Sequence, residues 1–520
     1  MAVSWNCNFG VIAASVDDTD LNCYIRDMLS TAADTGLAKS TSEETGDGGE
    51  RDRSALWVWA IIAVGAVLRL VALGHKSFWL DEIASVAIAH RAAPAFWHFL
   101  WHDEGNMALY YVLLRPWLYF GNGEGTVRVL SVVPGILSIA VMYLLGKRLF
   151  GRETGVLAAA LLALNPCAIA TSQEARAYSL LVLAVLLSSY LFVLLIEKPS
   201  YTLACCYAIV AGLSCYFHYF GVLVPAAHAI SLLALPQNRR PWKPLILAAA
   251  IIVVAAAPIL WLIHAQDIGH ISWVKPPSLL EFYHLGVFLA ASGGKAAGAV
   301  LLALDLLLVG FFAAKLWAVR RDDGELQRWR YTLVASSVVS PIVITLLVSI
   351  VRPVFYHRFL ILCLPGWVLM TALGAEQIRR RRWRAFAIAG VCGLSLVSTA
   401  ALYRHVTEDW RGAVSYLIAN AATDDRVLYY QSVGQFAGES YRDWLPGGNE
   451  RRPAAAGVNP PGMEWKNGID RAGRVWLVLY RAEAGDPQLQ AIEQELASQY
   501  VRGPEKKYRG VSVVEYSSKR

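Results

Sequence analysis

Long apolar runs alternate with short polar loops over most of the 520-residue chain. A helix needs roughly 20 predominantly apolar residues to cross the hydrocarbon core of a bilayer, and about eleven runs approach that length. They cover residues 55–73, 127–149, 155–170, 178–196, 201–217, 221–235, 245–263, 298–319, 331–351, 359–375 and 386–403. The pattern predicts a polytopic α-helical membrane protein.

One apolar run is too short for this scheme. Residues 106–120 are interrupted by Arg115 and Pro116, and a run of about fifteen residues is more typical of an interfacial or re-entrant segment than of a span. We therefore predict interfacial helices in the first outer loop.

Charge and composition fit the same interpretation. The chain is 56% hydrophobic and 17% charged, whereas soluble domains carry about 25% charged residues. Basic residues gather in short loops on one side of the predicted topology: Arg51, Arg53, Lys147, Arg148, Arg152, Arg239, Arg240, Lys243, Arg320, Arg321, Arg328, Arg330 and the run 379–384. The positive-inside rule assigns that side to the cytoplasm. The net charge of +7 therefore reports topology, and we expect no nucleic-acid partner.

The two ends of the chain differ from the middle. Residues 1–54 are predicted to be a disordered cytoplasmic tail before the transmembrane domain, 55–403; a start codon assigned too far upstream is the alternative. Residues 404–520 are predicted to form a small extracytoplasmic α/β domain, with helices within 408–421 and after Asp486, strands at 426–430, 474–480 and 510–516, and a long loop at 442–473. The protein is expected in the cell inner membrane.

Asp81 and Glu82 are the first candidates for chemistry. They lie in the stretch SFWLDEIASVAIAH, residues 77–90, next to an apolar run that resembles a helix lying on the membrane. A partly desolvated carboxylate is a stronger base, which suits a group that takes a proton from an acceptor hydroxyl. The alternative is a pair of solvated helix caps.

Other candidates lie in outer loops. His102, Asp103 and Glu104 could bind sugar hydroxyls, or they form a solvated loop; no second histidine follows His102 at metal-ligand spacing. Two further loops each combine arginine with other polar side chains. One contains Gln173, Glu174, Arg176 and Tyr178, and the other contains Arg352, Tyr356, His357 and Arg358. Lys275 is an isolated cation in a third loop. Guanidinium groups are well suited to phosphate, although an arginine here could instead reach lipid headgroups.

Outer-face carboxylates beside outer-face arginines suggest catalysis at a membrane surface. The arginines would hold a lipid-linked phosphate while a carboxylate activates the group that displaces it. The sequence requires no cofactor or metal, and it leaves a divalent ion open. A transporter and a non-catalytic envelope sensor are the alternatives, and a transporter should place ionisable residues on broken helices near the midplane.

Several motifs resemble a known family. They are LRL, SFWLDE, LYYVLL, VRVLSVVPGILSIAVMYLLGKRLFG, LLALNPCAIATSQEARAYSLL, RPVFYHRFLILCLPGW and EDWRGAVSYL, spread over residues 55–417. In this order they resemble bacterial GT-C glycosyltransferases of the mannosyltransferase-like branch, which includes protein O-mannosyltransferases and the lipid A aminoarabinose transferase.

The resemblance implies a multi-span transferase with an extracytoplasmic active site. Its donor would be a polyprenyl-phosphate-linked sugar, and its acceptor a lipid, a glycan or a protein. Asp81 would be the catalytic base in an inverting transfer, with Glu82 beside it. The loops 173–178 and 352–358 would contact the donor. One departure is Met107–Ala108, where many relatives have two prolines, so sugar or acceptor recognition by that loop is not implied.

Overall fold

The computed structural model describes residues 48–265, 273–292, 296–319, 324–448, 453–458, 472–482 and 485–519. The chain forms two compact units, Met1–Ala60 and Ile61–Arg520. In the first unit the described residues are the beginning of helix α2 (Gly48–Leu70). Residues 1–47 of the predicted tail lie outside the described residues. Helix α2 begins at Gly48, within the range 1–54 that was predicted to be the tail.

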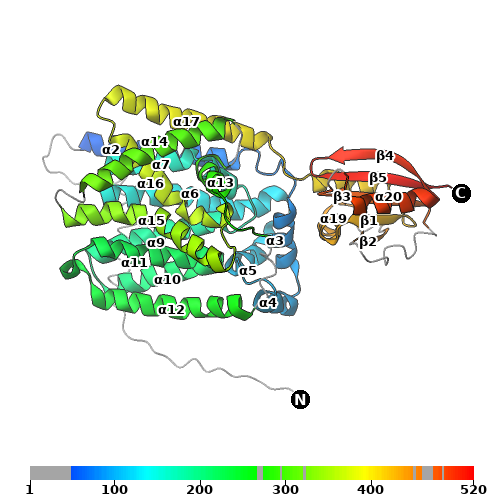
Figure 1. Cartoon of the computed structure of the whole chain (residues 1–520), viewed down its shortest axis with the longest axis horizontal. Coiled ribbons are helices and arrows are strands. Elements are labelled where there is room, and N and C mark those ends of the chain that lie inside the picture. The colour runs from blue at the N-terminus through cyan, green and yellow to red at the C-terminus, as the bar shows by residue number, and fades with distance from the viewer. Residues whose placement is uncertain are drawn as a thin grey trace, which may run out of the picture. The chain divides into compact units, whose positions relative to one another are not determined.

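Long apolar helices make up the first part of the second unit (Figure 1). Within the described residues, seven are long and apolar enough to cross a membrane. They are α6 (Glu124–Phe150), α9 (Tyr178–Glu197), α12 (Trp242–Ala265), α14 (Ala296–Val319), α15 (Glu325–Val351), α17 (Arg381–Arg404) and the continuous pair η6 (His357–Cys363) and α16 (Leu364–Glu376). The structure is therefore that of a multi-pass membrane protein.

Further apolar helices account for the remaining predicted spans. Helices α7 (Arg152–Leu164) and α8 (Pro166–Ser172) meet at a bend of 57°, where Pro166 lacks the N–H that would continue a straight helix. Shorter apolar helices are Ala55–Leu70 within α2, α10 (Tyr201–Phe217), the η2–α11–η3 segment Tyr219–Ala234, and α13 (Leu279–Ala291). Every predicted range overlaps one of these helices or joined helical segments, and the range 155–170 corresponds to the bent pair α7 and α8. Helix α13 was not predicted, and the number of spans stays a prediction.

The loop predicted to be the first outer one consists of short helices, as predicted. They are α3 (Leu80–His90), α4 (Ala93–His102), α5 (Ala108–Trp117) and η1 (Leu118–Phe120). Helix α5 has 10 residues and is therefore about 15 Å long, half the thickness of the hydrocarbon core.

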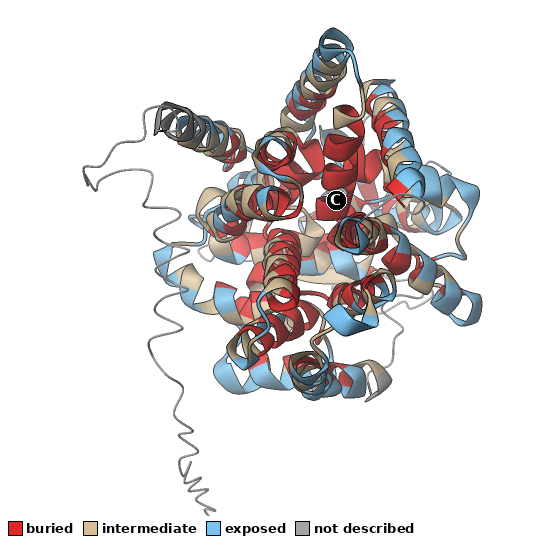
Figure 2. Ribbon diagram, turned by 90° about the vertical axis from the view of Figure 1, so that its left-hand side faces the viewer, coloured by how far each residue is buried: buried red, intermediate tan, exposed pale blue. Residues whose placement is uncertain are grey.

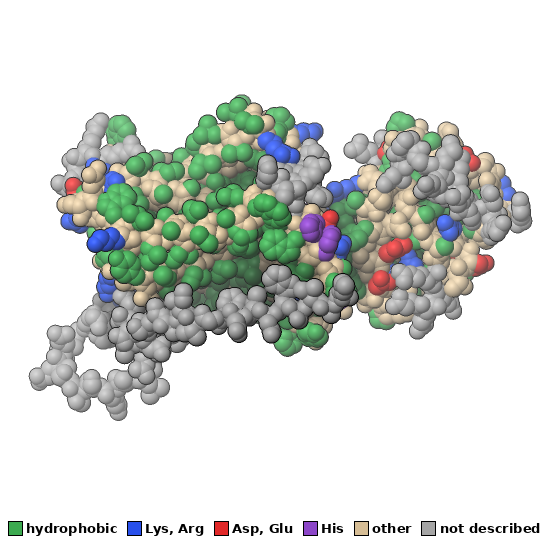
Figure 3. Space-filling model, turned by 90° about the horizontal axis from the view of Figure 1, so that it is seen from below, with side chains coloured by type: hydrophobic (Ala, Val, Ile, Leu, Met, Phe, Trp, Pro, Cys, Tyr) green, Lys and Arg blue, Asp and Glu red, His purple; other side chains and the backbone are tan. Residues whose placement is uncertain are grey.

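Buried residues line the inner faces of the helices, while the outer faces are exposed (Figure 2). Hydrophobic side chains cover much of the surface of the helical part in Figure 3, as expected for helices that face lipid. Exposed examples include Val253, Val254 and Ile350.

Helices α6 and α9 connect two chemically different ends of the helical part. At one end Glu197 pairs with Arg148 and, at 3.0 Å, with Arg330, so these predicted cytoplasmic loops lie together. Arg128 lies twenty positions before Arg148 on α6, which separates them by about 30 Å along the helix axis. Arg128 therefore marks the opposite end.

The C-terminal part contains one five-stranded sheet in the order β2-β1-β3-β5-β4. Strands β1 (Arg426–Tyr430), β2 (Ala454–Val458) and β3 (Arg474–Tyr480) are parallel, while β4 (Tyr500–Tyr508) and β5 (Val511–Ser518) are antiparallel neighbours. The helices are α18 (Trp410–Asn420), α19 (Ser432–Trp444) and α20 (Pro487–Gln499).

The predicted elements of this domain are present, and α19, β2 and β4 are additional. The prediction of one long loop over 442–473 was wrong, because this range contains the last residues of α19, up to Trp444, and the whole of β2. Strand β2 reads AAAGV, a composition with weak β propensity. The remainder of that range, 449–452 and 459–471, lies outside the described residues.

Candidate active site at the start of helix α3

Glu82 lies in the first turn of α3 and is fully buried. Its Oε1 accepts hydrogen bonds from Arg128 Nε and from the backbone N–H of Ala175, both at 2.8 Å. Its Oε2 accepts from Arg128 Nη2 at 2.7 Å and from the backbone N–H of Trp79 at 3.3 Å. Glu82 thus joins α3, α6 and the 173–177 loop, and both of its oxygens are occupied.

Arg128 is equally occupied. Besides its bonds to Glu82, Nη1 donates to the carbonyls of Leu73 and Lys76, and Nη2 donates to the carbonyl of Ser77. These contacts use all five guanidinium N–H groups. A buried pair satisfied in this way fixes the chain that leads into α3.

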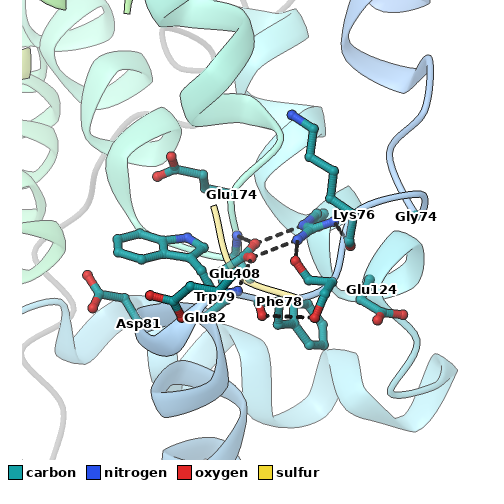
Figure 4. A network of polar contacts seen from close by, with 12 residues as sticks. Gly74, Lys76, Phe78, Trp79, Asp81, Glu82, Glu124, Glu174 and Glu408 are labelled. Carbon is teal, nitrogen blue, oxygen red and sulfur yellow. Dashed lines mark hydrogen bonds and ion pairs between the residues drawn. The ribbon is translucent and has the colours of Figure 1, made fainter. Parts of the chain in front are cut away.

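Asp81 is in a different position. Its side chain is 38% exposed, and its Oδ2 lies 3.9 Å from Arg176 Nη2. Arg176 Nη1 donates to the backbone carbonyl of Asp81 and to Ser85 Oγ, both at 3.3 Å, while Arg176 Nε has no hydrogen-bond partner among the described residues. In Figure 4 the Asp81 carboxylate lies at the edge of the group and points away from the network of dashed contacts. The Asp81 carboxylate is therefore open to a ligand, while the Arg176 guanidinium behind it is mostly buried and keeps one N–H without a partner among the described residues.

Arg358 brings a second cation to the same place. It forms an ion pair with Glu174, and its guanidinium lies 4.9 Å from the ring centroid of Trp79 and 5.3 Å from that of Tyr178. Burial raises the pKa of Glu174, and the Arg358 guanidinium opposes that rise. These two cation–π contacts restrict the position of the Arg358 guanidinium beyond what the ion pair does.

A polar pocket adjoins this group. Its lining residues come from the segment between α2 and α3, from α3 and α6, from α8 and the loop after it, and from the end of α17 and the residues that follow. They are Ala72, Leu73, Lys76, Ser77, Trp79, Glu82, Arg128, Ala170, Gln173, Glu174, Leu402, His405 and Thr407. Burial and the neighbouring Arg128 lower the pKa of Lys76, whose Nζ donates to the carbonyl of Leu402 at 2.8 Å. Because Trp79 and Glu174 also contact Arg358, the pocket and the arginine site share a wall.

The C-terminal domain contributes to the same region (Figure 4). Glu408 Oε2 accepts from the backbone N–H of Leu80 and from Trp410 Nε1, each at 2.9 Å, and its Oε1 accepts from Tyr480 Oη at 2.8 Å. Tyr441 Oη accepts from the backbone N–H of Phe78 at 3.0 Å. Two elements of this domain therefore hold the stretch that begins α3.

Solved structures share this architecture. ArnT from Cupriavidus metallidurans bound to undecaprenyl phosphate matches 88% of this chain and 98% of its own, with 14% identity and a TM-score of 0.58. Its apo form matches 89% of this chain and 98% of its own, with 14% identity and a TM-score of 0.59. The chain has a GT-C-like fold. The archaeal oligosaccharyltransferase AglB from Archaeoglobus fulgidus, in complex with an inhibitory peptide and a dolichol-phosphate, gives a weaker match: 12% identity, 81% and 69% coverage and a TM-score of 0.47.

Sequence comparison adds a narrower match. A family model described as dolichyl-phosphate-mannose-protein mannosyltransferase matches residues 108–263, less than a third of the chain. This range includes the 173–178 loop but neither Asp81 nor Arg358. No curated protein matches the chain. Residues 108–263 are therefore similar to that family, and the chain as a whole shares the GT-C-like fold.

The GT-C-like fold brings together only some of the predicted site residues. Asp81, Glu174, Arg176, Tyr178 and Arg358 meet as described. Glu104 also acts electrostatically on Arg176, and Tyr356 packs against His357 and Phe359, with ring centroids 4.4 Å and 5.2 Å apart.

Others lie apart from the Asp81 group. His102 and Asp103 are exposed, as are Lys275 and Arg352, and no contact links them to this group within the described part of the chain. Gln173 has a structural position, because its Nε2 donates to the carbonyls of Arg69 and Val71 at the end of α2.

Sequence reasoning missed Lys76, Arg128, His405 and Glu408. Arg128 lies near the start of an apolar run and was indistinguishable from a residue at a helix end. Glu408 lies in EDW, a motif used only for the family resemblance. Their partners lie far away in sequence, 46 positions for Arg128 and Glu82 and 328 for Glu408 and Leu80.

Proposed function

We propose that this chain transfers a sugar from a polyprenyl-phosphate carrier to an acceptor hydroxyl on the extracytoplasmic face of the cell inner membrane. The observation that carries the proposal is the open pair of Asp81 and Arg176 at 3.9 Å, in a GT-C-like fold. A lipid donor is supported by ArnT, which was solved with undecaprenyl phosphate bound. The acceptor would be a lipid, a glycan or a protein.

In the proposed reaction Asp81 is the catalytic base. Its carboxylate takes the proton of the acceptor hydroxyl while the hydroxyl oxygen attacks the anomeric carbon from the side opposite the phosphate. The bond between that carbon and the phosphate oxygen breaks, and the polyprenyl phosphate leaves with the bonding electrons. Anomeric configuration is therefore inverted.

Arg176 and Arg358 are proposed to bind the departing phosphate. Arg176 has an N–H without a partner among the described residues, and Arg358 is fixed by Glu174 and two aromatic rings. Preorganised cations stabilise charge that develops on a leaving group. Glu82 is proposed as a positioning residue, because all its acceptor capacity is used within the protein.

The proposed orientation follows from the two ends of α6. The basic loops around Arg148 and Arg330 would face the cytoplasm, which places Arg128 and the Asp81 group outside. The sheet domain, proposed to span 404–520 beside a transmembrane domain at 55–403, would then be extracytoplasmic.

Transport is less well supported by the charges inside the helices. Arg69 is fully buried and donates to the carbonyls of Gly65 and Ala163 at 3.0 and 3.1 Å. Asp305 Oδ2 accepts from Trp367 Nε1 at 3.0 Å. Both make hydrogen bonds that tie helices together, which is the structural use expected of intramembrane polar groups.

The decisive experiment replaces Asp81 in cells. A strain lacking the protein is complemented with wild type, Asp81→Asn or Asp103→Asn, and its membrane lipids and envelope glycans are compared by mass spectrometry. General-base catalysis contributes about 10²–10⁴-fold, so we expect a sugar-bearing species that wild type restores to be absent with Asp81→Asn. Full restoration by Asp81→Asn would falsify the proposed role.

Asp103→Asn is the matched control, because it makes the same chemical change at an exposed carboxylate in the same loop. It should restore the sugar-bearing species. Protein level and detergent-solubilised melting temperature of both variants show whether loss of product follows from loss of protein.

A further inference from the structure

A cluster of three potential metal ligands lies beside the arginine site. Glu281 and His284 are three positions apart on α13, so their side chains lie on one face of the helix. His357 comes from η6 and immediately precedes Arg358. One donor atom of each residue lies within 4.8 Å of the others.

The separations are long for hydrogen bonds. His284 Nδ1 is 3.4 Å from Glu281 Oε1, and His357 Nδ1 is 3.6 Å from Glu281 Oε2. His357 Nδ1 and Glu281 Oε2 are buried atoms without a hydrogen-bond partner among the described residues. Good N–H···O bonds fall at 2.7–3.2 Å, and buried polar atoms of this kind are rare unless something else satisfies them.

These separations match those of ligands that share one ion. Zinc–nitrogen and zinc–oxygen bonds of about 2.0–2.1 Å at a tetrahedral angle place two ligand atoms about 3.4 Å apart. The two histidine–glutamate separations fit a shared ion, and the three donor atoms, which lie within 4.8 Å of one another, would draw together around it. Such an ion would satisfy both unpartnered atoms.

We propose that Glu281, His284 and His357 bind a divalent transition-metal ion, with Zn²⁺ the best match to the donors. Two imidazoles and one carboxylate suit zinc, and three protein ligands leave one coordination position for water or a ligand oxygen. Calcium and magnesium are disfavoured because they take oxygen ligands.

The ion would connect α13 to η6. His357 is adjacent to Arg358, and Glu281 acts electrostatically on Tyr356, so the ion would fix the segment that presents Arg358. This inference is independent of the proposed transfer reaction, because ion binding is measured on the purified protein without any sugar donor or acceptor.

The test measures metal directly. The full chain is purified in detergent with a tag that lacks histidines and is stripped with a chelator. Separate samples of the stripped protein are then titrated with Zn²⁺ and with Co²⁺. Bound metal is counted by elemental mass spectrometry, and the visible bands of Co²⁺ report its geometry. We expect one ion per chain at this site, with a tetrahedral or five-coordinate Co²⁺ spectrum.

Variants decide which residues hold the ion. Glu281→Gln and His357→Gln should each weaken Zn²⁺ binding by roughly 100-fold or more, since even outer-shell changes cost 10–100-fold. The matched control is the double variant His98→Gln/His102→Gln, which removes an exposed pair whose ring centroids are 4.3 Å apart. It should keep the ion.

Unchanged zinc affinity in His357→Gln would overturn the proposal, and so would loss of the ion in the His98/His102 variant alone. His357→Cys addresses a failure of the glutamine variants to fold. It supplies a different zinc ligand, so it should retain the ion and add a sulfur-to-Co²⁺ charge-transfer band. Metal bound without that band would also contradict a role for position 357.

Discussion

Asp81 and Glu82 are neighbours in one helical turn, yet they form two unlike ion pairs. Glu82 meets Arg128 at 2.7 Å, with 1% and 4% of the side chains exposed. Asp81 lies 3.9 Å from Arg176, with 38% and 13% exposed. Successive residues on a helix point about 100° apart, so the same turn directs one carboxylate into the protein and the other toward an open surface.

The comparison separates a structural ion pair from the ion pair that we propose to be reactive. The Glu82–Arg128 pair is satisfied by hydrogen bonds on both sides and has no capacity left for a substrate. The Asp81–Arg176 pair keeps an exposed carboxylate and an unpartnered N–H. The buried Glu82–Arg128 pair therefore holds helix α3, which presents the exposed Asp81 carboxylate.

The largest effect is expected from opening the closed pair. Glu82→Gln removes the charge that compensates buried Arg128, and breaking such a pair typically lowers the free energy of unfolding by about 3–5 kcal/mol. Thermal melting in detergent should show a marked loss of stability, whereas Asp81→Asn should melt close to wild type.

A second variant separates the charge from the contacts. Replacing both partners, Glu82→Gln with Arg128→Gln, should recover part of the lost stability, since it removes the uncompensated charge. If Glu82→Gln melted like wild type yet lost transfer, Glu82 would belong to the reaction and the distinction between the two carboxylates would fail.

A smaller effect is expected at the second cation of the open site. Arg358→Lys keeps the charge but loses the planar fork and the stacking on Trp79 and Tyr178. We expect transfer to fall by about 10–100-fold, which is ~1.4–2.8 kcal/mol of transition-state stabilisation. Initial rates at saturating and limiting donor would show whether the loss lies in kcat or in kcat/KM.

Arg352→Lys is the control for that change. It alters the same residue type in the same segment, but at an exposed position. Equal losses in both variants would show that the segment as a whole, rather than the fixed guanidinium of Arg358, matters to transfer.

The two ion pairs also show what a sequence can predict. The apolar runs identified the membrane helices, because length and hydrophobicity act locally. Asp81, Arg176 and Arg358 stood out since charges are unusual beside outer helix ends. The pairing of Glu82 with Arg128 could not be predicted, because it depends on how α3 and α6 pack.

The missed helix α13 has the same kind of explanation. Its sequence, LLEFYHLGVFLAA, has 13 residues and contains Glu281 and His284, so it is too short to stand out as a span. Its position beside η6 follows from packing, and His357 is more than seventy positions away along the chain. A cluster that depends on such a contact leaves no local pattern.

The C-terminal domain should affect the open carboxylate indirectly. Glu408→Gln keeps the shape of the side chain but replaces one carboxylate oxygen with an NH2 group and removes the negative charge. The contacts with the Leu80 N–H, Trp410 and Tyr480 therefore lose their charged acceptor. Hydrogen bonds to charged groups contribute about 1.5–3 kcal/mol, so we expect ~2 kcal/mol lower stability and a several-fold loss of transfer. Glu439→Gln, on α19, is a suitable control. Wild-type melting of Glu408→Gln would mean that this contact does not support the start of α3.

The smallest effect is expected at His102, although the sequence suggested it for substrate binding. Its side chain is exposed and contacts His98 rather than the Asp81 group. Exposed substitutions usually change the free energy of unfolding by no more than about 0.5 kcal/mol, so His102→Gln should fold like wild type. Because His102 does not contact the Asp81 group, the variant should also transfer sugar within about twofold of wild type. Glu104→Gln is the informative neighbour, because Glu104 acts electrostatically on Arg176 and should affect transfer more. A tenfold rise in acceptor KM for His102→Gln, with Glu104→Gln unchanged, would instead place the acceptor over the exposed end of α4 and extend the open site beyond Asp81 and Arg176.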